Sequence, residues 1–502
     1  MLEKFHIKIE HLWGLIVLLG VFIFVNTHPI RPNDFWFHIA YGRLIVENRA
    51  LPVIDTFSFT MYGQPYEFAH NYWLAQVFMY WLFENGGAEW SILVFSILVT
   101  AAYAVIFLFG IFITRGNWRI AAFATLFAAS LGISNWNIRP QTLVYLLAAL
   151  SVVGIEYFKN SDRKFAWGIF LGVIMALWVN SHGTYFIPFI LAGAWLAELL
   201  WRVVREKKWQ VLLPGLQLFL FLLVGVLINP RGVKVFSYLL SMTSAPSVQG
   251  FVAEWQPVQF DGITGIIFLF MLSFLLIAWV TSGKRLTLSE TLSLIIFVLL
   301  SLRYERAVVW LGITQSPLML SILQEVFARF GKVAISPDRQ NVKLNFILVF
   351  CVVVLSLFSV PWLKQYWPLS PEKKNLYALD TPVDAVRFMI GKTLPNQVFA
   401  EIAFSSYITW AAGDRYWVFV DPRFDLYPED LWGDYLRISM AQGRWEEKLK
   451  NYNVDMLMLS IEAQPKLLRA VGGSPNWESI YQDDVAAVFV RQGWQESKTK
   501  KP

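Results

Sequence analysis

The sequence predicts an α-helical polytopic membrane protein that ends in an α/β domain outside the membrane. Hydrophobic residues make up 56% of the 502 residues and charged residues only 16%, whereas soluble domains average roughly 45–50% and about 25%. Long apolar runs alternate with short basic loops up to residue 363, and the hydropathy falls from Lys364 onward. The composition therefore excludes a soluble enzyme and a disordered chain.

Eleven apolar runs approach the length that crosses the hydrocarbon core, about 17–25 residues. They predict eleven transmembrane helices within a domain at residues 1–363, followed by an extracytoplasmic domain at residues 364–502. The first run lacks a cleavage site of small residues, so we expect an uncleaved signal anchor. The runs are His11–Asn26, Trp90–Thr114, Arg119–Ser134, Gln141–Phe158, Phe165–Val179, Tyr185–Val203, Val211–Ile228, Gly262–Val280, Leu288–Leu302, Ala307–Val326 and Lys343–Leu363.

The predicted orientation depends on the segment Asn71–Phe83, which at about 13 residues is short for a span. If it does not cross, basic clusters such as residues 159–164 and 202–208 fall in cytoplasmic loops, as the positive-inside rule requires. We therefore expect a cytoplasmic N-terminus and insertion in the cytoplasmic membrane. The first outer loop, residues 27–89, would hold two interfacial helices, Asp34–Asn48 and Asn71–Phe83. The net charge of +6 is explained by orientation, so no nucleic-acid partner is predicted.

The C-terminal domain alternates helix and strand patterns, which favours an α/β layer. The single cysteine, Cys351, lies in an apolar run, so no disulfide framework is expected. Helices are predicted at Pro382–Ile390, Pro428–Ala441 and Arg444–Tyr452, and strands at Gln397–Ile402, Trp417–Asp421, Asp455–Ser460 and Val485–Arg491.

Polar and ionisable residues gather at the outer helix ends and in the outer loops under this orientation. Such residues are costly at membrane depth and usually mark a site or a pair, so they predict a polar cleft that opens outward. They are Asp34, His38, Asp55, His70, Arg139, Gln141, Asn180, His182, Asn229, Arg231, Glu254, Arg303, Glu305 and Arg306.

The first outer loop carries the most informative motifs: NDFWFH at residues 33–38, LPVIDTFSF at 51–59 and YGQPY at 62–66. Here the sequence resembles the GT-C class of membrane glycosyltransferases, and most of all the catalytic subunits of bacterial and archaeal oligosaccharyltransferases. The resemblance covers the arrangement of the whole chain, with motif-level similarity at residues 33–75. It implies that Asp34 is the catalytic aspartate, that membrane lipids and a polyprenyl-phosphate-linked sugar donor are partners, and that the reaction faces outward.

The residue chemistry fits that role, although each residue also has a structural interpretation. Asp34 could act as the base that takes the acceptor's proton, or could cap its helix. Arg139, Arg303 and Arg306 could hold the donor phosphate, or could snorkel or pair with Glu305. Glu305 matches in position an acidic residue near the oligosaccharyltransferase active site.

Six further residues are predicted as possible supporting groups: His38, Asp55, His70, Gln141, His182 and Glu254. His38 lies four residues after Asp34 on the same helical face, but a lone interfacial histidine is more often a structural hydrogen-bonding group. The segment Asn135–Gln141 has no carboxylate where the metal-dependent relatives carry an acidic motif, and no zinc spacing is present. No metal site or other cofactor is therefore predicted.

A missing motif separates this chain from the resembled enzymes of protein N-glycosylation. The outer domain lacks the Trp-Trp-Asp-Tyr-Gly signature, and residues 406–410 with 421–425 occupy a loosely similar place. Asp421, Arg423 and Asp425 could bind an acceptor glycan or peptide, or could form a buried ion pair that braces this domain against the membrane part.

The sequence therefore favours an inverting transferase that passes a sugar to a cell-envelope acceptor, whether glycan, lipid or protein. Two alternatives stay open: a non-catalytic scaffold of the same fold, and a transporter of a lipid-linked substrate. Transporters tend to contain internal repeats and broken helices, and the sequence shows neither.

Overall fold

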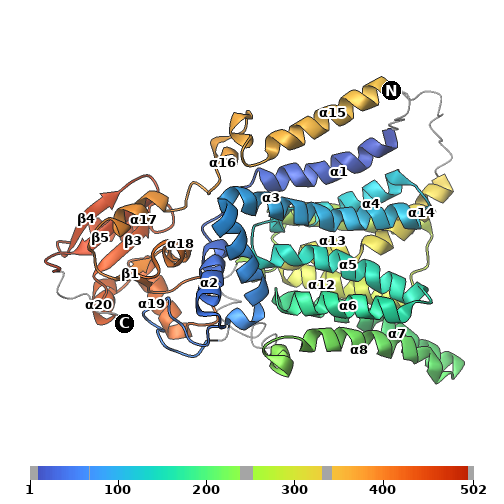
Figure 1. Cartoon of the computed structure of the whole chain (residues 1–502), viewed down its shortest axis with the longest axis horizontal. Helices are drawn as coiled ribbons and strands as arrows, with labels where there is room; N and C mark the ends of the chain where they lie inside the picture. Colours follow the sequence, from blue (N-terminus) through green and yellow to red (C-terminus); the bar gives the residue numbers. More distant parts are fainter. Residues whose placement is uncertain (1–8, 67, 238–252, 331–341, 496–502) are drawn as a thin grey trace. The chain divides into compact units, whose positions relative to one another are not determined.

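The computed structural model describes residues 9–66, 68–237, 253–330 and 342–495 (Figure 1). Their contacts form two compact units. The helical unit comprises the described residues of 1–28, 92–235 and 253–369, and the sheet unit those of 29–91, 236–252 and 370–502. The sequence-based division placed the first loop, residues 27–89, with the membrane domain, whereas the contacts group residues 29–91 with the C-terminal part.

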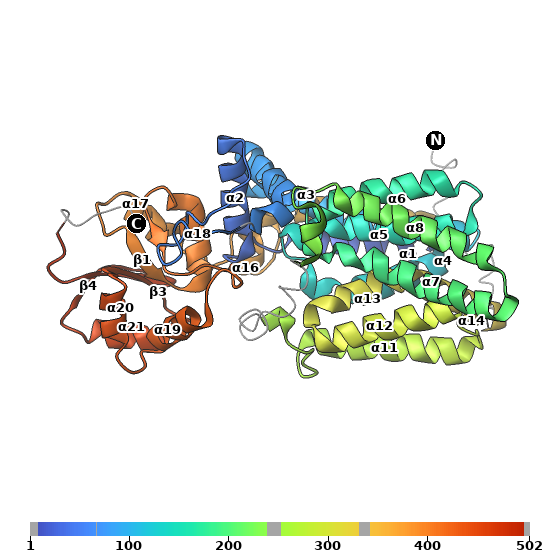
Figure 2. The ribbon, with the colours of Figure 1, turned by 90° about the horizontal axis from the view of Figure 1, so that it is seen from below.

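The helical unit is a bundle in which apolar helices run side by side (Figures 1 and 2). α6 packs on α5 and α8, α1 packs on α4 and α15, and α7 packs on α12. Its helices are α1 (Ile9–Asn26), the later part of α3 (Trp73–Ile113), α4 (Trp118–Ser130), α5 (Pro140–Asn160), α6 (Lys164–Val179), α7 (Ile187–Glu206), α8 (Leu213–Leu227), α11 (Ile263–Ser282), α12 (Leu288–Arg303), α13 (Val308–Thr314), α14 (Ser316–Phe330) and α15 (Val342–Ser359).

Each of the eleven predicted runs contains a helix, but the number of candidate spans is lower than predicted. Six helices in the described chain are long and apolar enough to cross a membrane, or seven if the bent pair α13 and α14 counts as one span. Others are short: α4 has 13 residues and α6 has 16. At about 1.5 Å per residue a 13-residue helix rises only about 20 Å, less than the roughly 30 Å of hydrocarbon.

The run Ala307–Val326, predicted as one helix, is broken. The segments Glu305–Thr314 and Ser316–Phe330 meet at 54°. Pro317 lacks the N–H that would bond the carbonyl of Ile313, and the Ser316 hydroxyl donates to that carbonyl instead, at 2.8 Å. The expectation of no broken helix was therefore wrong.

The predicted interfacial helix Asn71–Phe83 and the predicted span Trp90–Thr114 form the two legs of α3, which has 41 residues. The legs are separated at Gly87, whose φ of 66° and ψ of −159° are not helical. Glycine adopts this backbone conformation without the steric penalty that a Cβ atom brings. The predicted helix Asp34–Asn48 has the same bounds as α2 (Asp34–Asn48).

The sheet unit contains a mixed five-stranded sheet in the order β2-β1-β3-β5-β4. β1 pairs in parallel with β2 and β3, and β5 pairs antiparallel with β3 and β4. The elements are α16 (Pro371–Lys374), α17 (Val383–Ile390), β1 (Gln397–Ala400), α18 (Ile402–Ala412), β2 (Trp417–Val418), α19 (Glu429–Ser439), α20 (Trp445–Asn451), β3 (Met456–Ser460), α21 (Pro465–Gly472), β4 (Trp477–Gln482) and β5 (Ala486–Arg491). All four predicted strands and all three predicted helices are present, whereas α16, α18, α21 and β4 were missed.

Helices cover both faces of this sheet (Figure 2). Phe399, Leu457 and Phe489 pack on one face in a core with residues of α19, α20 and α21. Val398 and Val488 pack on the other face in a core with α17 and α18. This three-layer arrangement confirms the predicted α/β organisation of the C-terminal part.

Candidate active site

Asp34, the predicted catalytic residue, is the first residue of α2 in the sheet unit and is half-buried. A carboxylate in the first turn of a helix is stabilised by the helix dipole. The residue at the N-cap position, Asn33, makes no side-chain capping hydrogen bond.

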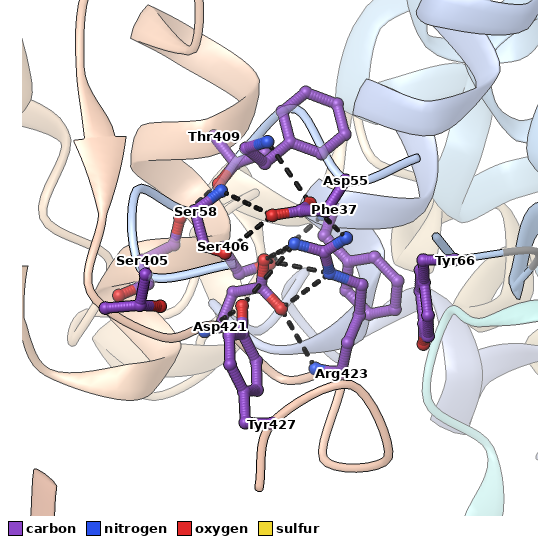
Figure 3. Close-up of polar contacts among 12 residues, drawn as sticks. Phe37, Asp55, Ser58, Tyr66, Ser405, Ser406, Thr409, Asp421, Arg423 and Tyr427 are labelled. Carbon is purple, nitrogen blue, oxygen red and sulfur yellow. Dashed lines mark hydrogen bonds and ion pairs between the residues drawn. The ribbon is translucent and has the colours of Figure 1, made fainter. Parts of the chain in front are cut away.

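Ser406, on α18, takes over the capping role for α2. The backbone N–H of Phe37 donates to Ser406 Oγ at 3.1 Å, and the Ser406 hydroxyl donates to the carbonyl of Asn33 (Figure 3). The Ser406 side chain is wholly buried. A residue more than 360 positions away in sequence thus holds the turn that presents Asp34. No local pattern in the sequence pointed to Ser406.

The remaining residues of α2 pack into the sheet unit. The Trp36 ring is 1% exposed and makes edge contacts with Phe83 of α3, with Tyr377 and with Tyr407 of α18. Buried aromatic side chains of this size contribute strongly to packing. α2 is consequently fixed by tertiary contacts along most of its length, which restricts the position of its first residue.

The sequence analysis named two histidines that lie in this unit, His38 and His70. His38 is buried, its Nδ1 lies 3.2 Å from Gln76 Nε2, and its ring lies against those of Phe37 and Tyr72. His70 lies in the short helix η2 (Phe68–Asn71) that precedes α3.

Asp55 belongs to a buried ionic network with Arg423 and Asp421 (Figure 3). Arg423 Nη1 lies 2.6 Å from Asp55 Oδ1, and Arg423 Nε donates to both Asp421 oxygens at 2.8 and 2.9 Å. Arg423 Nη1 also donates to the Tyr41 hydroxyl at 2.6 Å. Asp55 further accepts the Ser58 N–H and hydroxyl, at 3.1 and 2.6 Å. Arg423 and both carboxylates are fully buried.

Burial by itself would lower the pKa of the Arg423 guanidinium, but Asp421 and Asp55 raise it well above its usual value. Burial raises the pKa of the neighbouring Tyr41 and Tyr427 hydroxyls, so both stay protonated. Burial also raises the pKa of Asp425, although Tyr66 donates to it at 2.9 Å. Of the two sequence-based interpretations, the geometry supports the bracing ion pair, since this network ties the first loop and α2 to the strand-β2 region.

A second group of predicted residues meets in the helical unit. Arg139 precedes α5 and donates from Nη1 to Glu254 Oε2 at 2.6 Å and from Nη2 to Asn135 Oδ1 at 3.3 Å. Arg306 Nη2 donates to Gln141 Oε1 at 2.7 Å. Four residues predicted separately, Arg139, Gln141, Glu254 and Arg306, therefore form one hydrogen-bonded region.

Short helices bring these residues together. η7 (Ala253–Trp255) carries Glu254, and η8 (Glu305–Ala307) carries Arg306, whose guanidinium lies 5.0 Å from the Trp255 ring centroid. The Glu305 N–H donates to the carbonyl of Gln256 at 3.0 Å, which joins the two segments. The sequence analysis missed Trp255 and Asn135, although both are adjacent to predicted residues or motifs.

Two further predicted residues of the helical unit have other contacts. The Arg303 guanidinium lies 5.0 Å from the Tyr304 ring centroid. His182 precedes the short helix η4 (Gly183–Phe186), where its Nδ1 accepts the Thr184 N–H at 3.2 Å. In the hydrogen-bonded region, Arg139 and Arg306 outnumber Glu254 by one positive charge, which suits an anionic ligand.

Among the described residues, no group of three or more His, Cys, Asp or Glu side chains is placed to hold a metal ion. Each unit holds one set of candidate groups: the sheet unit has a half-buried carboxylate at a helix start, and the helical unit has arginines held by hydrogen bonds.

Comparisons with known proteins were made at the level of sequence and of structure. No protein-family model and no curated protein matches the sequence. In structure the chain is similar to archaeal oligosaccharyltransferase AglB from Archaeoglobus fulgidus, in complex with an inhibitory peptide and a dolichol-phosphate. The TM-score is 0.60 at 12% identity, over 96% of this chain and 74% of that chain.

The chain is also similar to two other transferases. ArnT from Cupriavidus metallidurans, bound to undecaprenyl phosphate, matches with a TM-score of 0.53 and 14% identity, over 95% of this chain and 97% of that chain. Arabinofuranosyltransferase AftD from Mycobacteria matches with a TM-score of 0.55 and 11% identity, over 96% of this chain but only 40% of that chain. These neighbours are GT-C glycosyltransferases, which confirms that the chain resembles this class in fold. The fold and the candidate spans indicate an integral membrane protein with a GT-C-like fold.

Proposed function

We propose that this chain is an inverting membrane glycosyltransferase that transfers a sugar from a polyprenyl-phosphate-linked donor to a cell-envelope acceptor on the extracytoplasmic side. One observation carries the proposal: a GT-C-like fold spans nearly the whole chain, and in it a half-buried aspartate begins the first-loop helix. Two of the neighbours were solved with dolichol-phosphate or undecaprenyl phosphate, which supports a lipid phosphate as the carrier.

Asp34 is assigned the role of general base. Its carboxylate takes the proton from the acceptor hydroxyl while that oxygen forms a bond to the anomeric carbon of the sugar. The bond from the anomeric carbon to the phosphate oxygen breaks, and the lipid phosphate leaves with the electron pair. A single displacement of this kind inverts the anomeric configuration. General-base catalysis contributes roughly 10²- to 10⁴-fold to such reactions.

Arg139 and Arg306 are assigned to the donor phosphate. Guanidinium groups remain charged and match phosphate oxygens with two parallel N–H donors. Gln141 and Glu254 already hold these two side chains by hydrogen bonds at 2.7 and 2.6 Å. Their geometry is thus largely set before a donor binds, which lowers the entropic cost of binding.

The test compares Asp34→Asn with Glu47→Gln, an exposed acid on the same helix. Both variants are reconstituted in vesicles with polyprenyl-phosphate-linked sugars, and donor binding and transfer are measured separately. We expect Asp34→Asn to lose transfer by at least about 10²-fold with donor binding retained, and Glu47→Gln to keep both. Full transfer by Asp34→Asn refutes the role of Asp34. A wild-type protein that binds no lipid-linked sugar would favour a non-catalytic scaffold.

A further inference from the structure

A cavity of about 440 Å³ lies inside the helical unit, away from the arginine region. Lining residues come from the ends of α3, α5 and α7, the start of α12 and the break between α13 and α14. Arg139 precedes the first turn of α5, whereas the cavity residue Glu156 lies near the end of that helix. At 1.5 Å per residue these positions are about 25 Å apart along the helix. The cavity is therefore separate from the candidate active site.

Charged side chains of both signs line the cavity. Glu156 pairs with Lys159 at 2.8 Å, and the buried Glu198 pairs with Arg202. Glu290, from the start of α12, also lines the cavity and pairs with Lys284 at 3.0 Å. The carboxylates offer acceptors for an ammonium group, and the two cations offer donors for an anionic oxygen. A lining of this kind complements a ligand that carries both charges.

The lining of the cavity includes a buried amide. Gln315 lies at the break between α13 and α14 and is 1% exposed. Its Nε2 donates to Thr314 Oγ1 at 3.2 Å, and within the part of the chain that the structure describes nothing donates to its Oε1. Because Gln315 lines the cavity, its carbonyl oxygen is an acceptor ready for a ligand donor.

Apolar side chains also line the cavity. Phe109 of α3, Ile155 of α5, Trp195 of α7 and Leu318 of α14 all line the cavity. A ligand that fits must therefore be amphipathic, with a polar head that reaches Gln315 and hydrocarbon that contacts these side chains.

We propose that this cavity binds a phospholipid whose headgroup carries a primary ammonium and a phosphate, as an ethanolamine phospholipid does. The ammonium donates to Gln315 Oε1 and to the lining carboxylates, and the phosphate accepts from Lys159 and Arg202. A quaternary ammonium has no N–H and cannot satisfy the Gln315 oxygen. A headgroup that carries only negative charge has no ammonium group to place against the three lining carboxylates, so they disfavour it. The predicted orientation places this end of the bundle at the cytoplasmic face.

The experiment uses the full-length protein in detergent and native mass spectrometry. Ethanolamine, choline and glycerol phospholipids with identical acyl chains compete for binding, and free phosphoethanolamine tests whether the headgroup suffices. The variant is Gln315→Leu, and the control is Gln324→Leu, the same change on α14 at a residue that does not line the cavity. The wild-type competition needs no variant, so it stands even if Gln315→Leu does not fold.

We expect wild type and Gln324→Leu to retain the ethanolamine lipid about tenfold better than the choline lipid, and Gln315→Leu to lose this preference. Equal retention of the ethanolamine and choline lipids overturns recognition of the ammonium. Stronger retention of the glycerol lipid overturns the zwitterionic ligand. A preference that survives in Gln315→Leu overturns the assignment to this cavity, and binding of free phosphoethanolamine at equal affinity overturns the lipid as the source. None of these outcomes depends on sugar transfer.

Discussion

Replacing Arg423 by methionine tests whether the buried ionic network holds the first loop in place. Arg423 lies between Asp55 and Asp421, and all three side chains are at most 1% exposed. Methionine keeps much of the volume but removes the charge, which leaves two carboxylates buried without a cation. Breaking a buried pair in this way costs about 3–5 kcal/mol. The Tyr41 hydroxyl also loses its donor at 2.6 Å.

The assay is hydrogen exchange measured on peptides that cover residues 51–66 and 415–427 in the intact protein. A loss of about 3–5 kcal/mol in local stability speeds exchange of the protected amides by roughly two to four orders of magnitude. The backbone N–H groups of Phe57 and Ser58, which donate to the Asp55 carboxylate at 3.2 and 3.1 Å, report directly on the network.

Two control variants separate charge burial from other effects. Arg387→Met breaks the exposed Arg387–Asp384 pair, and an exposed pair is worth at most about 1 kcal/mol. The triple change of Asp55→Asn and Asp421→Asn with Arg423→Met removes all three charges and should recover much of the loss. If Arg423→Met exchanges no faster than Arg387→Met, or if the triple variant is as unstable as the single one, the reasoning is wrong.

Three further predictions concern single side chains. Burial raises the pKa of Asp425 in the folded state, so ionisation of this carboxyl opposes folding above that pKa. Asp425→Asn should therefore unfold at a higher denaturant concentration than wild type at neutral pH. This difference in stability should disappear as the pH falls through the raised pKa toward the ordinary value. Glu254→Gln should tighten binding of a polyprenyl phosphate, because the amide oxygen can still accept from Arg139 and hold it while the competing negative charge is removed. Weaker binding in a lipid-phosphate titration would count against this role. Ser406→Ala should lower kcat with little change in donor affinity. Ser405→Ala should change neither, because the Ser405 hydroxyl donates to the carbonyl of Glu401 at the start of α18. Equal kinetics for the two variants would exclude positioning by Ser406.

Local patterns in the sequence predicted the helices and strands whose formation depends mainly on neighbouring residues. The apolar runs predicted where helices form, and α2 has the predicted bounds because its sequence is helical and tertiary contacts reinforce it. β4 was missed because it lies at the sheet edge, with Glu478 and Ser479 exposed and no regular alternation of buried residues. α18 was missed because Ser405 and Ser406 are unusual inside a helix and are buried by partners elsewhere in the chain.

For the candidate site, the sequence predicted which residues take part but not how they pair. Sorting polar residues by predicted membrane side identified Arg139, Gln141, Glu254 and Arg306, and the structure brings these four together. Which acid pairs with which arginine depends on how η7 and η8 fold back on the start of α5, and no spacing rule encodes that. The sequence analysis missed the helix break at Gln315 because Pro317 lies in an otherwise continuous apolar run.

The sheet unit gives the C-terminal residues a role that the sequence alone did not suggest. The first loop is continuous with the membrane helices in sequence, yet its folded contacts are with residues beyond 370. Ser406 caps α2, Arg423 binds Asp55, and Tyr407 packs on Trp36. A chain without residues 370–502 would keep every apolar run and would insert, but α2 would lose the contacts that fix its first turn. If Asp34 is the base, the C-terminal part acts on the reaction by holding that residue, whether or not it also binds the acceptor.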